Sequence, residues 1–264
     1  MSIALVVYAA LCTFGRAPKV ENVKHNQLLG PFMGGYVVWL ISPIERALVG
    51  RVSPNFVTAV SLVFCAATGV VAALGWLGMA VWLYAIGGIL DILDGRLARL
   101  SNAQTKSGAL FDSVSDRWAE LFVFSGYAWY LRDTPWLLAV LAAMGSSLMV
   151  SYTRARAEGL GIALSGGAMQ RAERILLITF GSLVAAWFAS ASIEIVGVVM
   201  TVCAVSCTGT AISRWLAAYR ELARIDGAQT TVAMPRPVPM SEIVVVPAQS
   251  QLRESAELGF IARR

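Results

Sequence analysis

Apolar residues along the chain are gathered into six long runs that short polar connections separate. A helix needs about 20 predominantly apolar residues to cross a bilayer, and each run is close to that length. The runs occupy 55–75, 78–100, 107–131, 135–158, 172–191 and 194–220. This pattern predicts an all-α integral membrane protein with six transmembrane helices.

The segment before the first run has a different pattern. Between 36 and 51, apolar residues recur at helical spacing beside Glu45, Arg46 and Arg51. Such a segment is typical of an amphipathic helix that lies in the membrane interface. We therefore expect a juxtamembrane helix before the first span, and Ser53 offers an N-cap for that span.

Three regions follow from these patterns. Residues 1–35 form an N-terminal segment that is interfacial or loosely packed, and 36–225 form the six-helix domain. Residues 226–264 contain four prolines and no sustained period, which predicts a flexible cytoplasmic tail. Only 14% of the residues are charged, against about 25% in soluble domains, in agreement with a membrane protein. A single histidine excludes a His-rich metal site.

The distribution of basic residues predicts the orientation. The connections near 75–78, 132–135 and 191–194 contain one basic residue, Arg132. The opposite ends of the spans carry most of the positive charge: Arg96, Arg99, Lys106, Arg154, Arg156, Arg171, Arg174, Arg214, Arg220 and Arg224. Because basic residues accumulate on the cytoplasmic side, we expect both termini and the carboxylates described next to be cytoplasmic.

Four aspartates lie within the second and third runs at helical spacing. Asp91 and Asp94 are three residues apart, and Asp112 and Asp116 are four apart, so each pair shares a helix face. Each ionised Asp costs roughly 2.5–3.5 kcal/mol at mid-bilayer, so cations must neutralise the group. Oxygen ligands of this kind suit Mg²⁺ or Mn²⁺, and two such ions are typical of phosphoryl displacement. The alternative is that the aspartates form salt bridges with Arg96, Arg99 and Arg117.

The string D-x-x-D-G-x-x-A-R-x(8)-G-x-x-x-D-x-x-x-D, from Asp91 to Asp116, resembles the signature of the CDP-alcohol phosphotransferase family. The resemblance implies a two-metal enzyme that transfers a phosphatidyl group from a CDP-linked lipid to an alcohol and releases CMP. It also implies roles for residues of this chain. The metal ligands would be Asp91, Asp94, Asp112 and Asp116, with Asp116 also the general base. The nucleotide site would contain Asn55, Thr58, Gly95, Ala98, Arg99 and Gly108.

A second group of basic residues bears on the acceptor. Arg154 and Arg156 end the fourth run, Arg171 and Arg174 open the fifth, and Arg214 lies within the sixth. Together they are suited to a cationic pocket for an acceptor that carries its own phosphate. For Arg156 and Arg171 this interpretation and a topological or lipid-contacting role stay equally open.

The block Ser-Tyr-x-Arg-Ala-Arg-Ala-Glu followed by x-Arg-x-Glu-Arg is similar to the prokaryotic phosphatidylinositol-phosphate synthases of that family. This resemblance implies CDP-diacylglycerol as donor, an inositol phosphate as acceptor, and a homodimer. The acceptor phosphate would contact Arg154, Arg156, Arg174 and Arg214. Glu120 stands where that branch commonly has Asp and offers hydrogen bonds to sugar hydroxyls.

Two other functions remain open at this point. The same chemistry on glycerol phosphate or another alcohol would keep the metal site and change only the acceptor. A cation transporter would use the aspartates as an ion path, but the sequence shows no internal repeat and no broken-helix signal.

Overall fold

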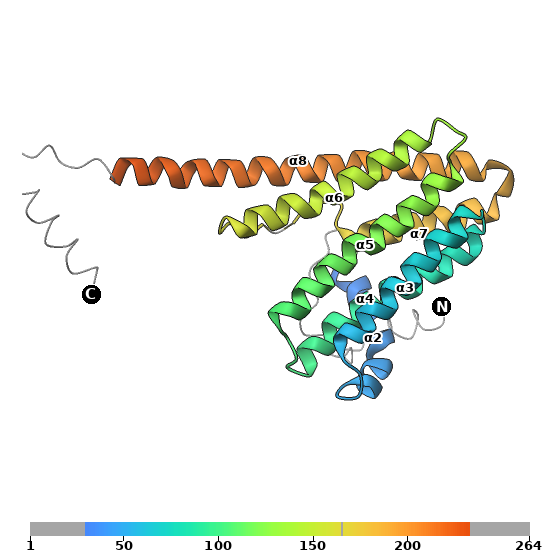
Figure 1. Cartoon of the computed structure of the whole chain (residues 1–264), viewed down its shortest axis with the longest axis horizontal. Helices are drawn as coiled ribbons and strands as arrows, with labels where there is room; N and C mark the ends of the chain where they lie inside the picture. Colours follow the sequence, from blue (N-terminus) through green and yellow to red (C-terminus); the bar gives the residue numbers. More distant parts are fainter. Residues whose placement is uncertain (1–29, 165, 233–264) are drawn as a thin grey trace, which may run out of the picture. The chain divides into compact units, whose positions relative to one another are not determined.

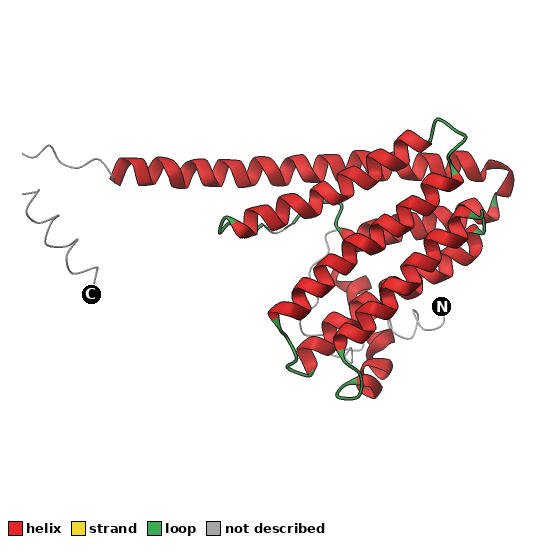
Figure 2. Cartoon of the chain, viewed as in Figure 1, coloured by secondary structure: helices red, strands yellow, loops and turns green. Residues whose placement is uncertain are grey.

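The computed structural model describes residues 30–164 and 166–232, and within these ranges every regular element is helical (Figures 1 and 2). The helices are α2 (Gly30–Leu48), α3 (Pro54–Ala73), α4 (Leu77–Leu100), α5 (Lys106–Tyr130), α6 (Leu137–Gly159), α7 (Arg171–Trp187) and α8 (Ser192–Val232), with a short 3₁₀ helix η1 (Ala189–Ala191) before α8. The predicted all-α class is confirmed for the described residues.

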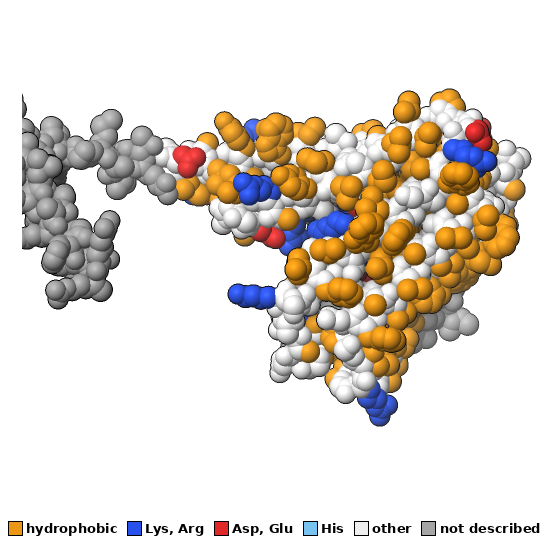
Figure 3. All heavy atoms as spheres, viewed as in Figure 1, with side chains coloured by type: hydrophobic (Ala, Val, Ile, Leu, Met, Phe, Trp, Pro, Cys, Tyr) orange, Lys and Arg blue, Asp and Glu red, His pale blue; other side chains and the backbone are white. Residues whose placement is uncertain are grey.

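In the described part of the chain, four helical segments are long and apolar enough to cross a membrane: Pro54–Ala73, Leu77–Leu100, Leu137–Gly159 and Ala189–Gly227. Large apolar side chains such as Trp82, Phe180 and Trp187 are exposed on the helices, and Figure 3 shows hydrophobic side chains across much of one face. A surface of this kind has to lie in lipid, because soluble monomers rarely expose such large apolar patches. The protein is an integral membrane protein.

The other two predicted spans, at 107–131 and 172–191, are not both long and apolar enough to be counted with these four. Helix α5 carries Asp112, Asp116, Arg117 and Glu120 within its length, which lowers its hydropathy. Helix α7 has only 17 residues, at the lower limit for crossing a bilayer. Within the described residues the structure therefore supports four spans by length and composition.

Local capping determines where two helices of the site begin. The Ser53 side chain accepts a hydrogen bond from the Phe56 amide at 3.3 Å at the start of α3. The Thr105 hydroxyl accepts one from the Gly108 amide at 3.0 Å at the start of α5. Both satisfy backbone donors that the first turn of a helix leaves without partners.

Helix α3 packs against both α4 and α5. The contact with α5 is very close, since a Cβ on Gly126 would overlap the backbone of Gly69. On the α4 side, the Ser61 hydroxyl donates to the Gly87 carbonyl at 2.9 Å. The close packing brings the start of α3 beside the end of α4 and the start of α5, where the signature residues lie.

The remaining described helices complete the bundle. Helix α7 packs against α4, and α6 packs against α5, around a core that includes Phe124, Tyr127 and Ile178. Helix α2 contacts α4, and buried Glu45 forms a salt bridge with Arg96 there.

Two boundaries differ from the predicted ones. Helix α2 begins at Gly30, before the predicted start at 36, and α8 continues to Val232, beyond the tail boundary predicted at 226. Residues 1–29 and 233–264 lie outside the described residues, and so do most of the predicted N-terminal segment and tail. The chain divides into two compact units, 1–219 and 220–264, and all the signature and acceptor residues belong to the first.

Candidate functional site

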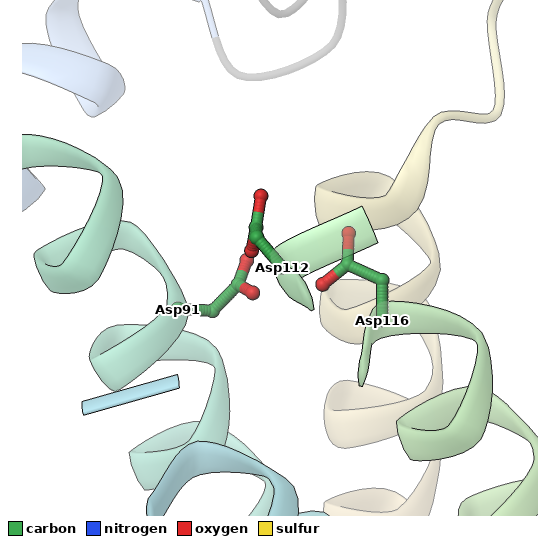
Figure 4. A group of neighbouring side chains, drawn as sticks. All are labelled: Asp91, Asp112 and Asp116. Carbon is green, nitrogen blue, oxygen red and sulfur yellow. The ribbon is translucent and has the colours of Figure 1, made fainter. Parts of the chain in front are cut away.

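Three of the four signature aspartates meet. Asp91 comes from α4, and Asp112 and Asp116 come from successive turns of α5. One carboxylate oxygen of each lies within 4.8 Å of the others, and Figure 4 shows the three side chains pointing toward one another. A set of converging carboxylate oxygens fits hard divalent cations such as Mg²⁺ and Mn²⁺. We call Asp91, Asp112 and Asp116 the carboxylate cluster.

An arginine from a third helix contacts the carboxylate cluster. Arg171, the first residue of α7, forms salt bridges through the same nitrogen, Nη1, with Asp91 and with Asp116. Its Nε is buried and has no hydrogen-bond partner among the described residues. The sequence left Arg171 undecided between a phosphate pocket and a topological role, and neither interpretation placed it against the aspartates.

Asp94 lies apart from the cluster. It is only 3% exposed, and its Oδ2 accepts a hydrogen bond from the Thr58 hydroxyl of α3 at 2.6 Å. The predicted nucleotide residue Thr58 therefore contacts a predicted metal ligand. Asp94 as a metal ligand stays a prediction, since its carboxylate is oriented toward α3.

Other predicted nucleotide residues lie where α3, α4 and α5 begin or end. A Cβ added to Gly108 would come within 3.3 Å of Asn55 Oδ1, so α3 and α5 meet at these two residues. A Cβ added to Gly95 would lie 3.6 Å from Arg99 Nη1, so the Arg99 side chain lies across the glycine. Ala98 is partly exposed on the same helix. The absence of side chains at Gly95 and Gly108 leaves room beside the cluster for a ligand.

Of the salt bridges that the sequence offered as an alternative, the structure contains the one between Arg117 and Asp116, and it is long. Arg96 pairs with Glu45 of α2. Arg117 donates to the Ser113 carbonyl at 2.5 Å, and its Nη1 is 3.8 Å from Asp116 Oδ2. The arginine in closest contact with the cluster is Arg171.

Arg174, one turn further along α7, is buried in a separate network. Its Nε and Nη2 both donate to Glu120 Oε1, and its Nη1 donates to the Met169 carbonyl at 3.3 Å. The Ser147 hydroxyl of α6 donates to the other oxygen of Glu120. Glu120 is therefore engaged by α6 and α7, where the sequence suggested that it meets sugar hydroxyls.

Arg214 of α8 is also held by the protein. Its Nη1 donates to the Val150 carbonyl at 3.0 Å, and its Nη2 donates to the Gly166 carbonyl at 2.7 Å. Arg154 and Arg156 are exposed on α6, and Arg154 pairs with Glu158 at 2.8 Å. The predicted acceptor residues thus separate into two buried arginines and two exposed ones.

Comparison with known proteins agrees with this geometry. The family model described as CDP-alcohol phosphatidyltransferase matches residues 51–212. A phosphatidylinositol phosphate synthase of Mycobacteroides abscessus is 35% identical over 162 residues, covering 56% of this chain and 70% of that protein. An archaetidylinositol phosphate synthase of Methanothermobacter thermautotrophicus is 41% identical over 136 residues, covering 50% of this chain and 68% of that protein.

Solved structures are similar as well. The crystal structure of Mycobacterium tuberculosis phosphatidylinositol phosphate synthase with CDP-DAG bound has a TM-score of 0.62 and 28% identity, covering 69% of this chain and 94% of that one. A second structure of that enzyme, with manganese and citrate, also has a TM-score of 0.62, with 67% of this chain and 88% of that one covered. The matched region contains the whole signature from Asp91 to Asp116, and on this evidence the chain belongs to the CDP-alcohol phosphatidyltransferase family.

Proposed function

We propose that this enzyme transfers a phosphatidyl group from CDP-diacylglycerol to an inositol phosphate and releases CMP. The observation that carries the proposal is the carboxylate cluster, formed by side chains of α4 and α5, with Arg171 of α7 against it. The bacterial and archaeal relatives are both named as synthases of an inositol phosphate lipid. A related crystal structure contains CDP-DAG, and another contains manganese.

Asp91, Asp94, Asp112 and Asp116 would hold two divalent ions, Mg²⁺ or Mn²⁺. When bound, the ions supply positive charge that stabilises the pyrophosphate and makes CMP a better leaving group. For Asp94 to take part, its carboxylate would need a free oxygen while Thr58 keeps the other. The 2.6 Å hydrogen bond to Oδ2 leaves Oδ1 for this purpose.

Asp116 would act as the general base on the acceptor hydroxyl. An alcohol is a poor nucleophile until a base within hydrogen-bond reach takes its proton. Asp116 belongs to the cluster and lies on α5 one turn from Asp112, so the base and the reacting phosphate would share one site.

The nucleotide part of the donor would contact Asn55, Thr58, Gly95, Ala98, Arg99 and Gly108. The proximity of Asn55 to Gly108 supports a single nucleotide site shared by α3 and α5. Exposed Arg99 is placed to meet a phosphate, because a guanidinium binds phosphate oxygens through two N–H groups at once.

The acceptor phosphate would contact Arg154, Arg156, Arg174 and Arg214. The buried pair supports a cationic region between α6, α7 and α8, and the exposed pair stands at the end of α6. Glycerol phosphate would use the same region, so it is the alternative acceptor.

We also propose six spans, with α5 and α7 crossing the membrane beside the other four. Both pack against a helix that is apolar enough to span, α5 on α3 and α7 on α4. Buried polar groups on spans are tolerated when they pair with one another, as Glu120 and Arg174 do. With α2 at the interface, both termini and the cluster would be cytoplasmic, and the enzyme would act as a homodimer.

The test is CMP release by the purified protein in detergent with CDP-diacylglycerol and Mn²⁺ or Mg²⁺. The acceptor panel contains inositol phosphate, free inositol, glycerol phosphate and serine. We expect turnover with inositol phosphate alone. Turnover with glycerol phosphate would make glycerol phosphate the acceptor in place of inositol phosphate. If no acceptor supports CMP release while liposomes containing the protein take up Mn²⁺, the protein would be a cation transporter and the proposed enzymatic function would be wrong.

The role of Asp116 has its own test. Asp116→Asn should abolish CMP release because the amide cannot accept the proton, while CDP-diacylglycerol binding is largely retained. Asp133→Asn is the control, since Asp133 lies 82% exposed in the connection after α5. Turnover by Asp116→Asn at more than a few per cent of the wild-type rate would remove Asp116 from the base role.

A further inference from the structure

Arg171 is the cation that the protein itself brings to the carboxylate cluster. Its Nη1 contacts Asp91 and Asp116 together, and these are two of the three carboxylates that converge within 4.8 Å. The guanidinium thus lies against the oxygens that a divalent ion would use.

We propose that Arg171 is a built-in competitor for the metal centre. Its guanidinium occupies the carboxylate cluster when no divalent ion is bound and leaves it when an ion binds, so Arg171 sets the metal affinity of the enzyme. The inference rests on the metal-dependent function proposed above, because it takes the carboxylate cluster as the place where ions bind.

The physical reason is that the two cations cannot share the same oxygens. A guanidinium and a divalent ion that contact the same two carboxylates would be separated by only a few ångströms, and like charges at that distance repel strongly where water is scarce. The carboxylate lone pairs that accept from Arg171 are also the ones that would coordinate the ion. Metal binding therefore has to displace the side chain.

The surrounding contacts allow the side chain to leave while α7 stays in place. Arg174, three residues further on, anchors the start of α7 to Glu120 of α5. The loop before α7 is held where the Met169 amide donates to Thr210 of α8 at 3.1 Å. Within residues 30–164 and 166–232, the buried Nε of Arg171 has no hydrogen-bond partner, so only part of its hydrogen-bonding capacity is used in the cluster. A rotation of one side chain is sufficient for the exchange.

Arg117 provides the matched control. Its Nη1 lies 3.8 Å from Asp116 Oδ2, so it places a positive charge near the same carboxylate. However, it hydrogen-bonds to Ser113 of its own helix, at 2.5 Å to the carbonyl and 3.0 Å to the hydroxyl, and the one carboxylate of the cluster within salt-bridge distance of it, among the described residues, is that of Asp116. Removing Arg117 changes the charge beside the cluster without removing a side chain that bridges it.

The experiment is a Mn²⁺ titration of the metal-free full-length protein in detergent, with the free ion followed by electron paramagnetic resonance. We expect Arg171→Gln to bind Mn²⁺ about ten- to a hundredfold more tightly than wild type, which corresponds to ~1.4–2.8 kcal/mol. Arg117→Gln should differ from wild type by less than about fivefold, because partly exposed charge pairs are weak.

Thermal unfolding gives a second readout that does not depend on activity. Without metal, Arg171→Gln should unfold at a lower temperature than wild type, since Asp91 and Asp116 lose the guanidinium that contacts them. Saturating Mn²⁺ should then raise its Tm by more than it raises that of wild type. If Arg171→Gln does not fold, Arg171→Lys keeps the charge on a shorter side chain that bridges the two carboxylates less well, and it should bind Mn²⁺ several-fold more tightly than wild type.

The outcomes separate this inference from the proposed function. Tighter Mn²⁺ binding by the Arg171 variants supports the inference, including the case in which only the variants bind. Wild-type binding with no gain in the Arg171 variants, or an equal gain in Arg117→Gln, overturns the competition and leaves the metal-dependent function standing. If neither wild type nor the variants bind Mn²⁺, both proposals are wrong.

Discussion

The buried pair of Arg174 and Glu120 gives the sharpest prediction about how the site is held. Arg174 is 2% exposed and Glu120 5%, and the Ser147 hydroxyl completes the network. Removing one member of a buried ion pair leaves the other charge without compensation, at a cost of about 3–5 kcal/mol. Replacing both by apolar residues of similar size is often close to neutral in stability.

We therefore expect Arg174→Met and Glu120→Met each to destabilise the protein by about 3–5 kcal/mol, and the double variant to be more stable than either single variant. Each kcal/mol corresponds to a shift in Tm of roughly 2–4 °C for a chain of 150–250 residues, so each single variant should lose about 6–20 °C. The assay is thermal unfolding in one detergent at fixed lipid content, followed as a double-mutant cycle.

The control cycle uses Arg154 and Glu158. Arg154 Nε and Glu158 Oε1 also form a salt bridge, at 2.8 Å, but the two side chains are 47% and 48% exposed. Exposed pairs of this spacing contribute about 0.3–0.5 kcal/mol, so the two substitutions should be nearly additive. If the losses of Arg174→Met and Glu120→Met are additive as well, the reasoning about buried charge is refuted.

The same double variant decides what Arg174 does for the acceptor. If Arg174 contacts the acceptor phosphate, the folded double variant should show a raised KM for inositol phosphate and an unchanged KM for CDP-diacylglycerol. If both KM values equal those of wild type, Arg174 serves only to hold α7 against α5.

Two further substitutions test the packing around the site. Gly126→Ala should lower stability by about 1–3 kcal/mol or more, because its Cβ would overlap the Gly69 backbone and force α3 from α5. The control is Gly145→Ala, whose Cβ would meet none of the described atoms within 4 Å. Thermal unfolding should show it to be as stable as wild type or more stable. Thr58→Val should weaken Mn²⁺ binding roughly 10–100-fold, the usual effect of losing a group that orients a metal ligand, since it removes the 2.6 Å hydrogen bond to Asp94. Unchanged Mn²⁺ affinity in Thr58→Val would mean that Asp94 is not a ligand.

The helix that begins at the site was predictable because an apolar run of spanning length and an N-cap residue coincide there. The run predicted at 55–75 is helix Pro54–Ala73, with Ser53 as its cap. The extent of α8 was not predictable in this way, since hydropathy ends before the helix does. Beyond 220, good helix formers and the Glu221–Arg224 pair at 2.6 Å continue the helix through polar sequence.

The carboxylate cluster was predictable only in part. Spacing of four residues placed Asp112 and Asp116 on one face of α5, and the structure agrees. Spacing of three was also read as one face for Asp91 and Asp94, yet Asp91 meets α5 and α7 while Asp94 meets Thr58 of α3. Residues three apart on a helix differ by about 60° in direction, and a helix surrounded by neighbours sends such a pair to different partners.

Arg171 shows the physical limit of the sequence argument most clearly. Several carboxylates within a membrane protein require cations, and the sequence predicted metal ions, with salt bridges to Arg96, Arg99 and Arg117 as the alternative. An arginine satisfies the same requirement. The spacing of Arg171 and Arg174 does not predict that the first contacts Asp91 and Asp116 and the second contacts Glu120. Arginine and a metal ion are therefore alternative cations at one site. The sequence contains the residues for both, but it does not show that the two compete. Only the packing of α7 against α4 brings them to the same oxygens.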